Sequence, residues 1–264
     1  MSLCVIDIGN TNVKIAFFKE DRLEESRSIS SKSCLKEHLT PLFQSRSIDK
    51  AFIASVHEET EKSIKEILSA LNISTVMLDP SRLGLTLDVD EPKAVGQDRI
   101  ANCYGALHHF PTFDCIVVDI GTAVTFDFVT KEGSYLGGAI YPGIDISAKA
   151  LASYTDKLPV VQVLKPESAL SRTTESHIQS GIYYGLLGAV ERIISELRLT
   201  SASPSSVKVL ATGGATRIEN TTMCEDKVLF VEDLKDLVDF IDPHLTVVGL
   251  YEIFKEQLSK KQEK

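Results

Sequence analysis

The amino-acid sequence predicts an α/β protein built from two similar lobes, each a mixed sheet flanked by helices. The first observation is a repeated pattern: residues 3–11 read LCVIDIGNT and residues 114–122 read DCIVVDIGT. An apolar run rich in Val and Ile that ends in turn residues is typical of a buried strand entering a tight turn. The second observation is that the order of predicted strands and helices starts again at the second copy. The chain is therefore expected to contain two related halves.

The first half begins with three strands and continues with alternating helices and strands. Apolar runs bounded by turn residues predict strands at 3–8, 13–19, 22–28, 51–56 and 74–78. Apolar residues at helical spacing predict helices at 33–45, 58–71 and 98–108. The first three strands form a plausible antiparallel meander. This order resembles one ribonuclease-H-like lobe.

The second half repeats that order. Strands are predicted at 115–121, at 123–130, in the segment leading to 137–143, and in 207–216. Helices are predicted at 144–154, 174–197 and 247–258. The boundary lies near residues 109–113, which gives an N-terminal lobe of 1–112 and a C-terminal lobe of 113–264.

The segment 174–197 is the strongest predicted helix of the chain. Thr173 and Thr174 stand at its start and suit the N-cap position, where a hydroxyl accepts a hydrogen bond from a free backbone N–H. Gly181, Gly185 and Gly188 lie within it, and each would cost an isolated helix about 1 kcal/mol. We therefore expect another backbone to pack closely against this helix, either from a second helix or from a second subunit.

The composition is that of a soluble globular protein. Of the 264 residues, 43% are hydrophobic and 25% charged, and the formal net charge is −9, which argues against a broad nucleic-acid-binding face. No stretch approaches the ~20 apolar residues of a membrane span, and no basic region precedes the first apolar run. Without a CxxC pair, the cysteines are expected to be buried reduced thiols in a cytoplasmic protein. They are Cys4, Cys34, Cys103, Cys115 and Cys224.

The two repeated turns carry groups that bind anions and cations. Thr11 and Thr122 offer hydroxyl and backbone N–H groups to an anion. Asp7 and Asp119 end the two apolar strands, and a carboxylate in this position can hold a cation. Two such turns suggest two halves that face one nucleotide.

Three glycine turns follow three apolar strands, at Gly9, Gly121 and Gly213–Gly214. Together they resemble the phosphate-1, phosphate-2 and adenosine segments of the actin-like ATPase and sugar-kinase superfamily. In that arrangement, turns from both lobes clamp the phosphates, and a carboxylate holds the metal that bridges them. No GxxxxGK[ST] motif occurs, so the sequence does not predict a P-loop. The predicted fold is two ribonuclease-H-like lobes of the actin-like ATPase superfamily.

The most specific stretch, PKAVGQDRIAN at 92–102, lies between the two lobes. Asp98 and Arg99 follow a glycine just before a predicted helix. A carboxylate beside a substrate hydroxyl can accept its proton during phosphoryl transfer, and a guanidinium can bind a carboxylate or phosphate. The alternative interpretation is an exposed helix start at which Asp98 acts only as a cap.

Taken in order, these motifs resemble the type III pantothenate kinase family, and the resemblance spans nearly the whole chain. The matching segments are DIGNTNVK at 7–14, PKAVGQDRIAN at 92–102, DIGTAVTFD at 119–127, GGAIYPG at 137–143 and ATGG at 211–214. The resemblance implies transfer of the ATP γ-phosphoryl group to the primary hydroxyl of pantothenate, in the first step of coenzyme A synthesis. It also implies a homodimer with a shared site, Mg²⁺, and a monovalent cation, either K⁺ or NH₄⁺.

The resemblance assigns roles to residues by motif. Asp98 would be the proton acceptor and Asp119 the ligand of the monovalent cation. Pantothenate would contact Gly96, Gln97, Asp98, Arg99 and Thr174. ATP would contact Asp7, Ile8, Gly9, Asn10, Thr11, Asn12, Val13, Lys14 and Thr122.

Some positions depart from the family pattern or have two interpretations. Val89 occupies a place where many members carry a Tyr that helps to bind pantothenate. Lys14 is not general in the family, so a solvated strand charge and an ATP contact are both open. Asp127 could face the site because it lies eight residues beyond Asp119, or it could be structural. His108, His109 and His177 are expected to have no catalytic role.

Two other functions remain possible from the sequence. One is a kinase for a different small alcohol such as a sugar, although no convincing set of sugar-binding side chains is found. The other is a regulatory relative that keeps the fold without the activity, since some homologues of this family are described as accessory factors for transcription. The presence of Asp98, Asp119 and Thr122 argues against loss of activity.

Overall fold

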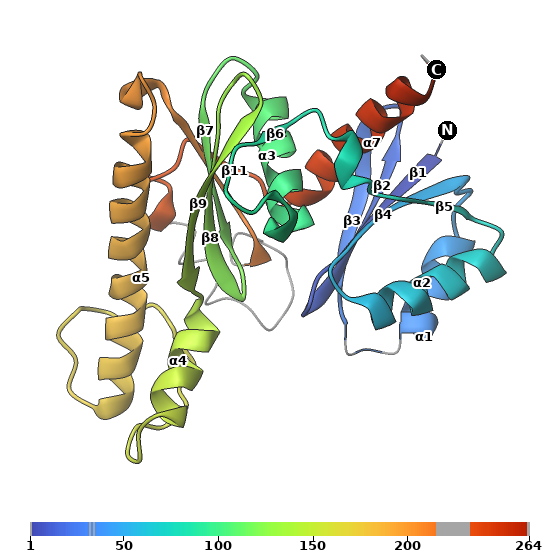
Figure 1. Ribbon diagram of the computed structural model, residues 1–264. Coiled ribbons are helices and arrows are strands. Elements are labelled where there is room, and N and C mark those ends of the chain that lie inside the picture. The colour runs from blue at the N-terminus through green and yellow to red at the C-terminus, as the bar shows by residue number, and fades with distance from the viewer. Residues whose placement is uncertain (1, 32, 34, 215–232, 263–264) are drawn as a thin grey trace. The chain divides into compact units, whose positions relative to one another are not determined.

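The repeated sequence pattern forms the same part of two sheets. The computed structural model describes residues 2–31, 33, 35–214 and 233–262 (Figure 1). The strands are β1 (Ser2–Ile8), β2 (Asn12–Lys19), β3 (Arg22–Ser30), β4 (Lys50–Ser55), β5 (Ser74–Met77), β6 (Thr86–Leu87), β7 (Cys115–Ile120), β8 (Ala123–Val129), β9 (Ser134–Pro142), β10 (Lys208–Thr212) and β11 (Phe240–Ile241). The helices are α1 (Leu35–Gln44), α2 (Glu58–Ala70), α3 (Gln97–His109), α4 (Ile144–Ser153), α5 (Thr174–Arg198) and α7 (Leu245–Gln262). Short 3₁₀ helices lie at Pro80–Arg82, Pro92–Ala94 and Pro204–Ser206.

The two sheets have the same strand order and directions. The chain divides into two compact units, Met1–His109 with His244–Lys264, and Phe110–Pro243. The first sheet has the order β3-β2-β1-β4-β5, and the second has the order β6-β9-β8-β7-β10-β11, which repeats the first with β6 added at the edge beside β9. Each sheet joins an antiparallel meander to two parallel strands, β4 and β5 or β10 and β11. The predicted ribonuclease-H-like fold class is confirmed.

The first sheet is buried on both faces, which explains the unbroken apolar run of β1. Cys4, Ile6 and Ile8 belong to a core cluster that includes the apolar residues of α1 and α2. Leu3 and Val5 belong to a second cluster that includes residues of α3 and α7. Because successive strand residues point to opposite faces, both faces of β1 must be apolar.

The C-terminal helix α7 belongs to the first unit, whereas the sequence-based division placed it in the second lobe. Val247 and Phe254 of α7 pack in one cluster with Phe52 of β4. The rings of Phe18 and Tyr251 stack with their centroids 4.1 Å apart. An amphipathic helix packs on whichever apolar face complements it, and its own periodicity does not identify that face. The other division, between residues 109 and 110, falls in the predicted boundary segment.

The helix α5 covers one face of the second sheet (Figure 1). Thr173 is its N-cap, as predicted: its hydroxyl accepts from the Ser176 N–H at 3.1 Å, and the Ser176 hydroxyl accepts from the Thr173 N–H at 3.1 Å. The close neighbour expected at the helix glycines is not supplied by the described part of this chain. A Cβ atom at Gly181, Gly185 or Gly188 would meet nothing within 4 Å.

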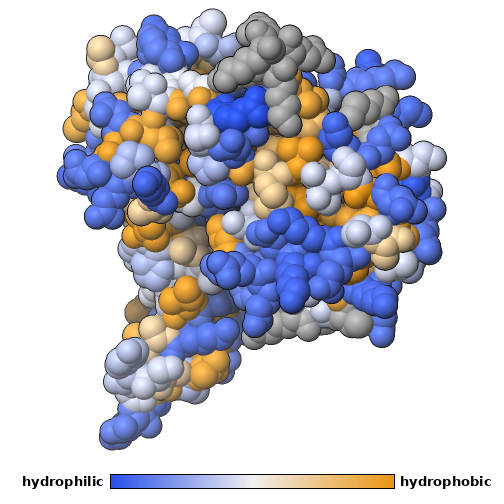
Figure 2. All heavy atoms as spheres, turned by 45° about the vertical axis from the view of Figure 1, so that its right-hand side comes forward, coloured by the Kyte–Doolittle hydropathy of each residue, from blue (hydrophilic) through white to orange (hydrophobic). Residues whose placement is uncertain are grey.

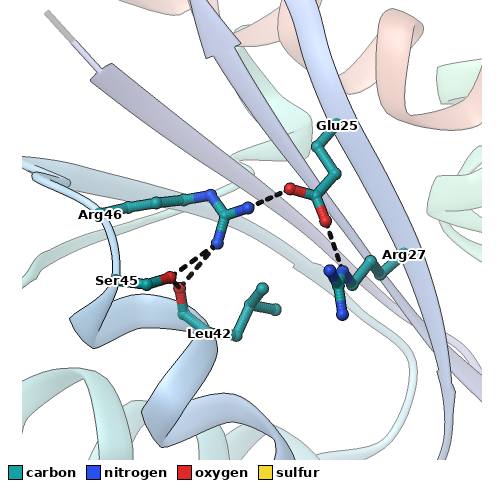
Figure 3. A network of polar contacts seen from close by, with 5 residues as sticks. All are labelled: Glu25, Arg27, Leu42, Ser45 and Arg46. Atoms are coloured by element: carbon teal, nitrogen blue, oxygen red, sulfur yellow. Dashed lines mark hydrogen bonds and ion pairs between the residues drawn. The ribbon is translucent and has the colours of Figure 1, made fainter.

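A polar network connects the C-terminal end of α1 to strand β3 of the first sheet (Figure 3). The guanidinium of Arg46 donates to the carbonyl of Leu42 at 3.0 Å and lies 4.4 Å from the centre of the Phe17 ring. Glu25 of β3 forms ion pairs with Arg27 and Arg46. The hydrogen bond from Arg27, followed by the two positive charges, lowers the pKa of Glu25 below its usual range. The network therefore stabilises the fold above that range and weakens as the pH falls through the lowered pKa.

Several expectations from composition can be compared with the structure. Cys4, Cys103 and Cys115 are buried free thiols, as predicted, and burial raises the pKa of Cys115 to about 12. Cys34 and Cys224 lie outside the described residues. The face shown in Figure 2 is mostly hydrophilic, with smaller apolar patches between. Within the described residues, no helix combines the length and the apolar character that crossing a membrane requires.

Candidate active site

The first glycine turn joins β1 to β2 and presents exposed backbone. The Gly9 N–H donates to the Asn12 carbonyl at 3.0 Å, which closes the turn. The Ser31 hydroxyl donates to the carbonyls of Asn10 at 3.0 Å and Thr11 at 2.9 Å. Asn10 and Thr11 are exposed. Their carbonyls are held from the end of β3, so the turn has a fixed shape with its tip open to a ligand.

Asp7 and Lys14 lie next to this turn as cross-strand partners. The Lys14 ammonium is 3.6 Å from Oδ2 of Asp7 and donates to the Thr246 hydroxyl of α7 at 3.0 Å. The Asp7 side chain is 9% exposed and that of Lys14 is 22% exposed. A carboxylate this buried is costly unless a cation or a donor meets it, and Lys14 meets that need. Lys14 is therefore an ion-pair partner of Asp7, and the interpretation as a solvated strand charge is wrong.

The start of α3 lies at the same edge of the first sheet. The Val56 N–H donates to the Ile8 carbonyl at 3.0 Å, and the Ser55 N–H donates to Oε1 of Gln97 at 3.2 Å. These bonds join the ends of the parallel strands β1 and β4 to the first residue of α3. The first turn of α3, which carries Asp98, is therefore fixed to the sheet edge that carries the first glycine turn.

Asp98 is exposed in the first turn of α3. Its Oδ1 accepts from the Arg99 N–H at 2.8 Å, and no other hydrogen bond of this carboxylate is formed among the described residues. A Cβ atom at Gly96 would lie 2.4 Å from that oxygen, so glycine leaves room for the carboxylate in this orientation. The helix N-terminus favours a negative charge here. The carboxylate accepts from one of the free N–H groups of the first turn of α3, which agrees with the capping interpretation, and the role as proton acceptor stays a prediction.

The second glycine turn joins β7 to β8 in the other unit. Asp119 is the next-to-last residue of β7 and is half-buried. The Gly121 N–H donates to the Ala123 carbonyl at 3.0 Å, and the Gly143 N–H donates to the Thr122 carbonyl at 3.2 Å. Thr122 is exposed at the tip of the turn. The turn thus resembles the first one, with a carboxylate near the strand end and an exposed threonine, although Thr122 lies two residues beyond Ile120 and Thr11 lies three residues beyond Ile8.

The third glycine turn meets the second at Asp119. Thr212, the last residue of β10, pairs in register with Asp119 of the parallel strand β7. Gly213 has a φ of +104°, and a Cβ atom there would lie 2.5 Å from Oδ1 of Asp119. The Thr212 hydroxyl is buried and has no hydrogen-bond partner in the described part of the chain. Residues 215 and 216 of the predicted strand-turn segment lie outside the described residues.

The remaining candidates lie elsewhere in the two units. Thr174 is the exposed first residue of α5. Asp127 is buried and accepts from the Tyr135 hydroxyl at 2.9 Å, which favours the structural interpretation. His177 contacts the Ser171 carbonyl at 3.0 Å. No group of three or more His, Cys, Asp or Glu side chains that could hold a metal ion is found among the described residues.

Sequence reasoning did not identify Thr246 and Gly143 as parts of the site. Thr246 contacts Lys14 from 232 positions away, and no local pattern announces this contact. Gly143 had a signal, because it ends the GGAIYPG motif, but its hydrogen bond to Thr122 depends on how β9 returns to β8.

Solved structures share this fold. A Baf family protein from Campylobacter jejuni has a TM-score of 0.58 at 22% identity, covering 97% of this chain and 99% of its own. The activator of the 2-hydroxyisocaproyl-CoA dehydratase from Clostridium difficile, with bound ADPNP, has a TM-score of 0.52 at 14% identity, covering 100% and 98%. At these identities the likeness concerns the fold alone. The fold is therefore the predicted pair of ribonuclease-H-like lobes.

Comparison of the sequence with known proteins identifies the family. The model of type III pantothenate kinase matches residues 3–196. A type III pantothenate kinase from Geobacillus sp. (strain WCH70) is 32% identical over 272 residues, covering 98% of this chain and 99% of the relative. Another, from Legionella pneumophila (strain Corby), is 36% identical over 225 residues, covering 81% and 88%. This chain belongs to the type III pantothenate kinase family, as its motifs predicted.

Proposed function

We propose that this protein transfers the γ-phosphoryl group of ATP to the primary hydroxyl of pantothenate, the first step of coenzyme A synthesis. Family membership supports the reaction. The observation that carries the proposal is the exposed Asp98 carboxylate, fixed by α3 to the sheet edge that bears the first glycine turn. A cytoplasmic location, where coenzyme A precursors are phosphorylated, belongs to the same proposal.

In this reaction the hydroxyl oxygen of pantothenate forms a bond to the γ-phosphorus, and the bond from that phosphorus to the β–γ bridging oxygen breaks. ADP leaves with the electron pair of the broken bond, and the hydroxyl proton passes to Oδ of Asp98. The transition state of phosphoryl transfer is loose, so the base acts mainly by orienting the hydroxyl. Arg99, with Gly96, Gln97 and Thr174, is proposed to hold pantothenate.

ATP is proposed to contact the first turn, residues 7–14, and Thr122. Backbone N–H groups of glycine turns suit phosphate oxygens, and a lysine can neutralise part of their charge. Asp7 offers the carboxylate oxygen that Mg²⁺ prefers, and Mg²⁺ is normally shared between the protein and substrate phosphates. Lys14 forms an ion pair with Asp7, and its ammonium group would lie near the phosphates bound at this turn.

The surroundings of Asp119 suit a monovalent cation such as K⁺ or NH₄⁺. The carboxylate and the Thr212 hydroxyl are oxygen donors on the same face of adjacent parallel strands. That hydroxyl is buried and unpartnered among the described residues, and Gly213 keeps a Cβ atom out of the space beside Asp119. A cation held there would add positive charge near the proposed phosphate site.

The direct test measures ADP release with pantothenate, with hexoses and with no acceptor. We expect ADP release to require pantothenate, and mass spectrometry should identify 4'-phosphopantothenate. Release that is faster with a hexose would indicate a sugar kinase. No release with any acceptor, from a folded protein that binds ATP, would favour the regulatory alternative.

The exposed face of α5 is proposed to form the homodimer contact. Gly181, Gly185 and Gly188 leave this face without side chains, and the neighbouring Tyr184 is 39% exposed. Tyr154, 91% exposed, follows α4, which packs beside α5. Small residues allow two helix backbones to approach closely, and exposed aromatic side chains are enriched at interfaces.

We expect a dimer by light scattering at micromolar concentration, and Gly185→Leu should weaken it. Among the described residues, nothing outside the adjacent turns of α5 lies within 4 Å of a Cβ atom at this position, so the subunit fold should survive. Overfilling a packed interface typically costs about 1–3 kcal/mol, which raises the dimer Kd roughly 5- to 150-fold. Gly185→Ala is the matched control, since one methyl adds little volume. A wild-type enzyme that is monomeric and fully active would contradict the proposal.

Val89 provides a further test of pantothenate binding. It is half-buried in the segment before α3, where many family members carry a tyrosine. A tyrosine hydroxyl could bond a polar substrate, and a neutral hydrogen bond contributes ~0.5–1.5 kcal/mol. Val89→Tyr should therefore lower the pantothenate KM roughly two- to tenfold in steady-state kinetics, with the ATP KM little changed. An unchanged or raised pantothenate KM in a folded variant would show that Val89 is a packing residue or is already compensated.

A further inference from the structure

The segment between β5 and α3 is held at several points by α3 and α7. It carries Val89 and ends at Gly96. At its start, the Gln257 side chain accepts from the Asp79 N–H at 3.4 Å and donates to the Asp79 carbonyl at 2.8 Å. The Arg82 guanidinium then donates to the Gln257 carbonyl at 3.2 Å. These contacts fix the beginning of the segment to α7.

The next anchor is the hydroxyl of Tyr104 on α3. It accepts from the Gly84 N–H at 2.6 Å and from the Leu85 N–H at 3.3 Å, and it donates to Oε2 of Glu256 on α7 at 2.6 Å. One hydroxyl therefore joins three pieces of the first unit. Burial, with the hydrogen bond to Glu256, raises the pKa of Tyr104 well above its usual range. The hydroxyl keeps its proton and its donor role throughout the neutral range.

Beyond this junction, Thr86 and Leu87 form the short edge strand β6. Leu85, Leu87 and Val95 are partly buried against the core cluster of α3 and α7. Residues 88 and 90–94 are exposed, and Val89 is half-buried. The position of Val89 therefore depends on the anchors that precede it, at Gly84, at Leu85 and in β6, whereas Asp98 is held separately by α3 and by Gln97.

We propose that Tyr104 is a positioning residue that fixes the segment 83–95 for pantothenate binding, without touching the substrate. This inference rests on the proposed function, because the contact of this segment with pantothenate follows from family membership. Glu256 completes the junction by fixing the direction of the Tyr104 hydroxyl. The expected signature is a change in pantothenate KM with little change in kcat or in ATP KM.

The test compares Tyr104→Phe with Tyr251→Phe. Tyr251 lies on α7 in the same core cluster and also donates its hydroxyl to a carboxylate, that of Asp21, in the turn between β2 and β3. Both variants lose one hydrogen bond to a carboxylate, and Tyr104→Phe also removes the hydroxyl oxygen that accepts from the Gly84 and Leu85 N–H groups, which is the anchoring contact under test. Tyr104→Phe should raise the pantothenate KM about three- to tenfold with kcat within twofold. Tyr251→Phe should leave both constants unchanged.

Two further measurements separate anchoring from general loosening. Glu256→Gln keeps an acceptor for Tyr104 and should behave as wild type, whereas Glu256→Ala should raise the pantothenate KM. Amide hydrogen exchange without substrates should be faster across residues 83–95 in Tyr104→Phe and unchanged in α3. A folded Tyr104→Phe protein with unchanged pantothenate KM, or with equal changes in both KM values, would overturn the inference.

Failure of the proposed function can be distinguished from failure of this inference by the assay that reports it. Wild-type protein that released no ADP with pantothenate would overturn that function, and with it the substrate part of this inference. The exchange measurement still decides the structural part, because unchanged exchange across 83–95 in Tyr104→Phe would show that Tyr104 does not anchor the segment.

Discussion

Asp98→Asn is expected to lose most of kcat while the protein keeps its fold. Asparagine preserves the shape and can still accept from the Arg99 N–H, but it cannot take the proton of the substrate hydroxyl. Removing a general base typically costs ~10²–10⁴-fold in rate, and the loose transition state favours the lower part of that range. Steady-state ADP release should show this loss in kcat, with the ATP KM little affected.

The control for Asp98→Asn is Glu59→Gln. Glu59 is an exposed acid in the first turn of α2, so the control removes a negative charge from a comparable helix position. Each substitution removes a favourable charge–dipole interaction of about 0.3–1 kcal/mol, and the two melting curves should shift alike. Near wild-type turnover by a folded Asp98→Asn protein would mean that Asp98 is not the proton acceptor.

Asp119→Asn is expected to lose most activity in potassium buffer and to weaken the response to the cation. Wild-type protein should be active in potassium or ammonium and show little activity in sodium or lithium. The reason is that the half-buried Asp119 carboxylate and the buried Thr212 hydroxyl place oxygen atoms on the same face of adjacent strands, and oxygen atoms are the ligands that such cations prefer. ADP release in the four chloride salts measures the dependence.

A binding measurement accompanies the rates. Potassium should raise the melting temperature of wild-type protein relative to choline chloride at equal ionic strength, because a ligand that binds only the folded state stabilises it. Asp119→Asn should lose this increase. Equal rates in potassium, ammonium, sodium and lithium, together with equal melting temperatures, would remove the cation site from the proposal.

Much of the fold was predictable because the controlling signals are local. The apolar runs before Asp7 and Asp119 are buried strands. The first run is apolar throughout because both faces of its sheet are covered. Thr173 was recognisable as an N-cap because its partner, Ser176, is three residues away. The first site turn and the first turn of α3 were also predictable, since each is a short motif with its own turn chemistry.

The errors concern long-range packing. The periodicity of α7 predicted a helix but not the first unit as its place, because Val247 and Phe254 would suit many apolar faces. Lys14 was open to two interpretations, and its partner Thr246 comes from the other end of the chain. The glycines of α5 predict a backbone neighbour that the described part of this chain does not supply, so a contact with a second subunit stays a prediction. Contacts between residues that are far apart in the sequence depend on how the whole chain folds, so no local pattern predicts them.

The first unit is made of two separate stretches of the sequence, and this affects the order in which the two units can fold during synthesis. Residues 244–264 are synthesised last, yet α7 covers the face of the first sheet that carries Val5 and Phe52. Domains usually fold in the order in which they emerge. Here the continuous unit 110–243 can finish while the earlier residues 1–109 still expose an apolar face. The first unit can therefore complete its fold only after residues 244–264 have been synthesised, which is later than the unit that lies between its two pieces.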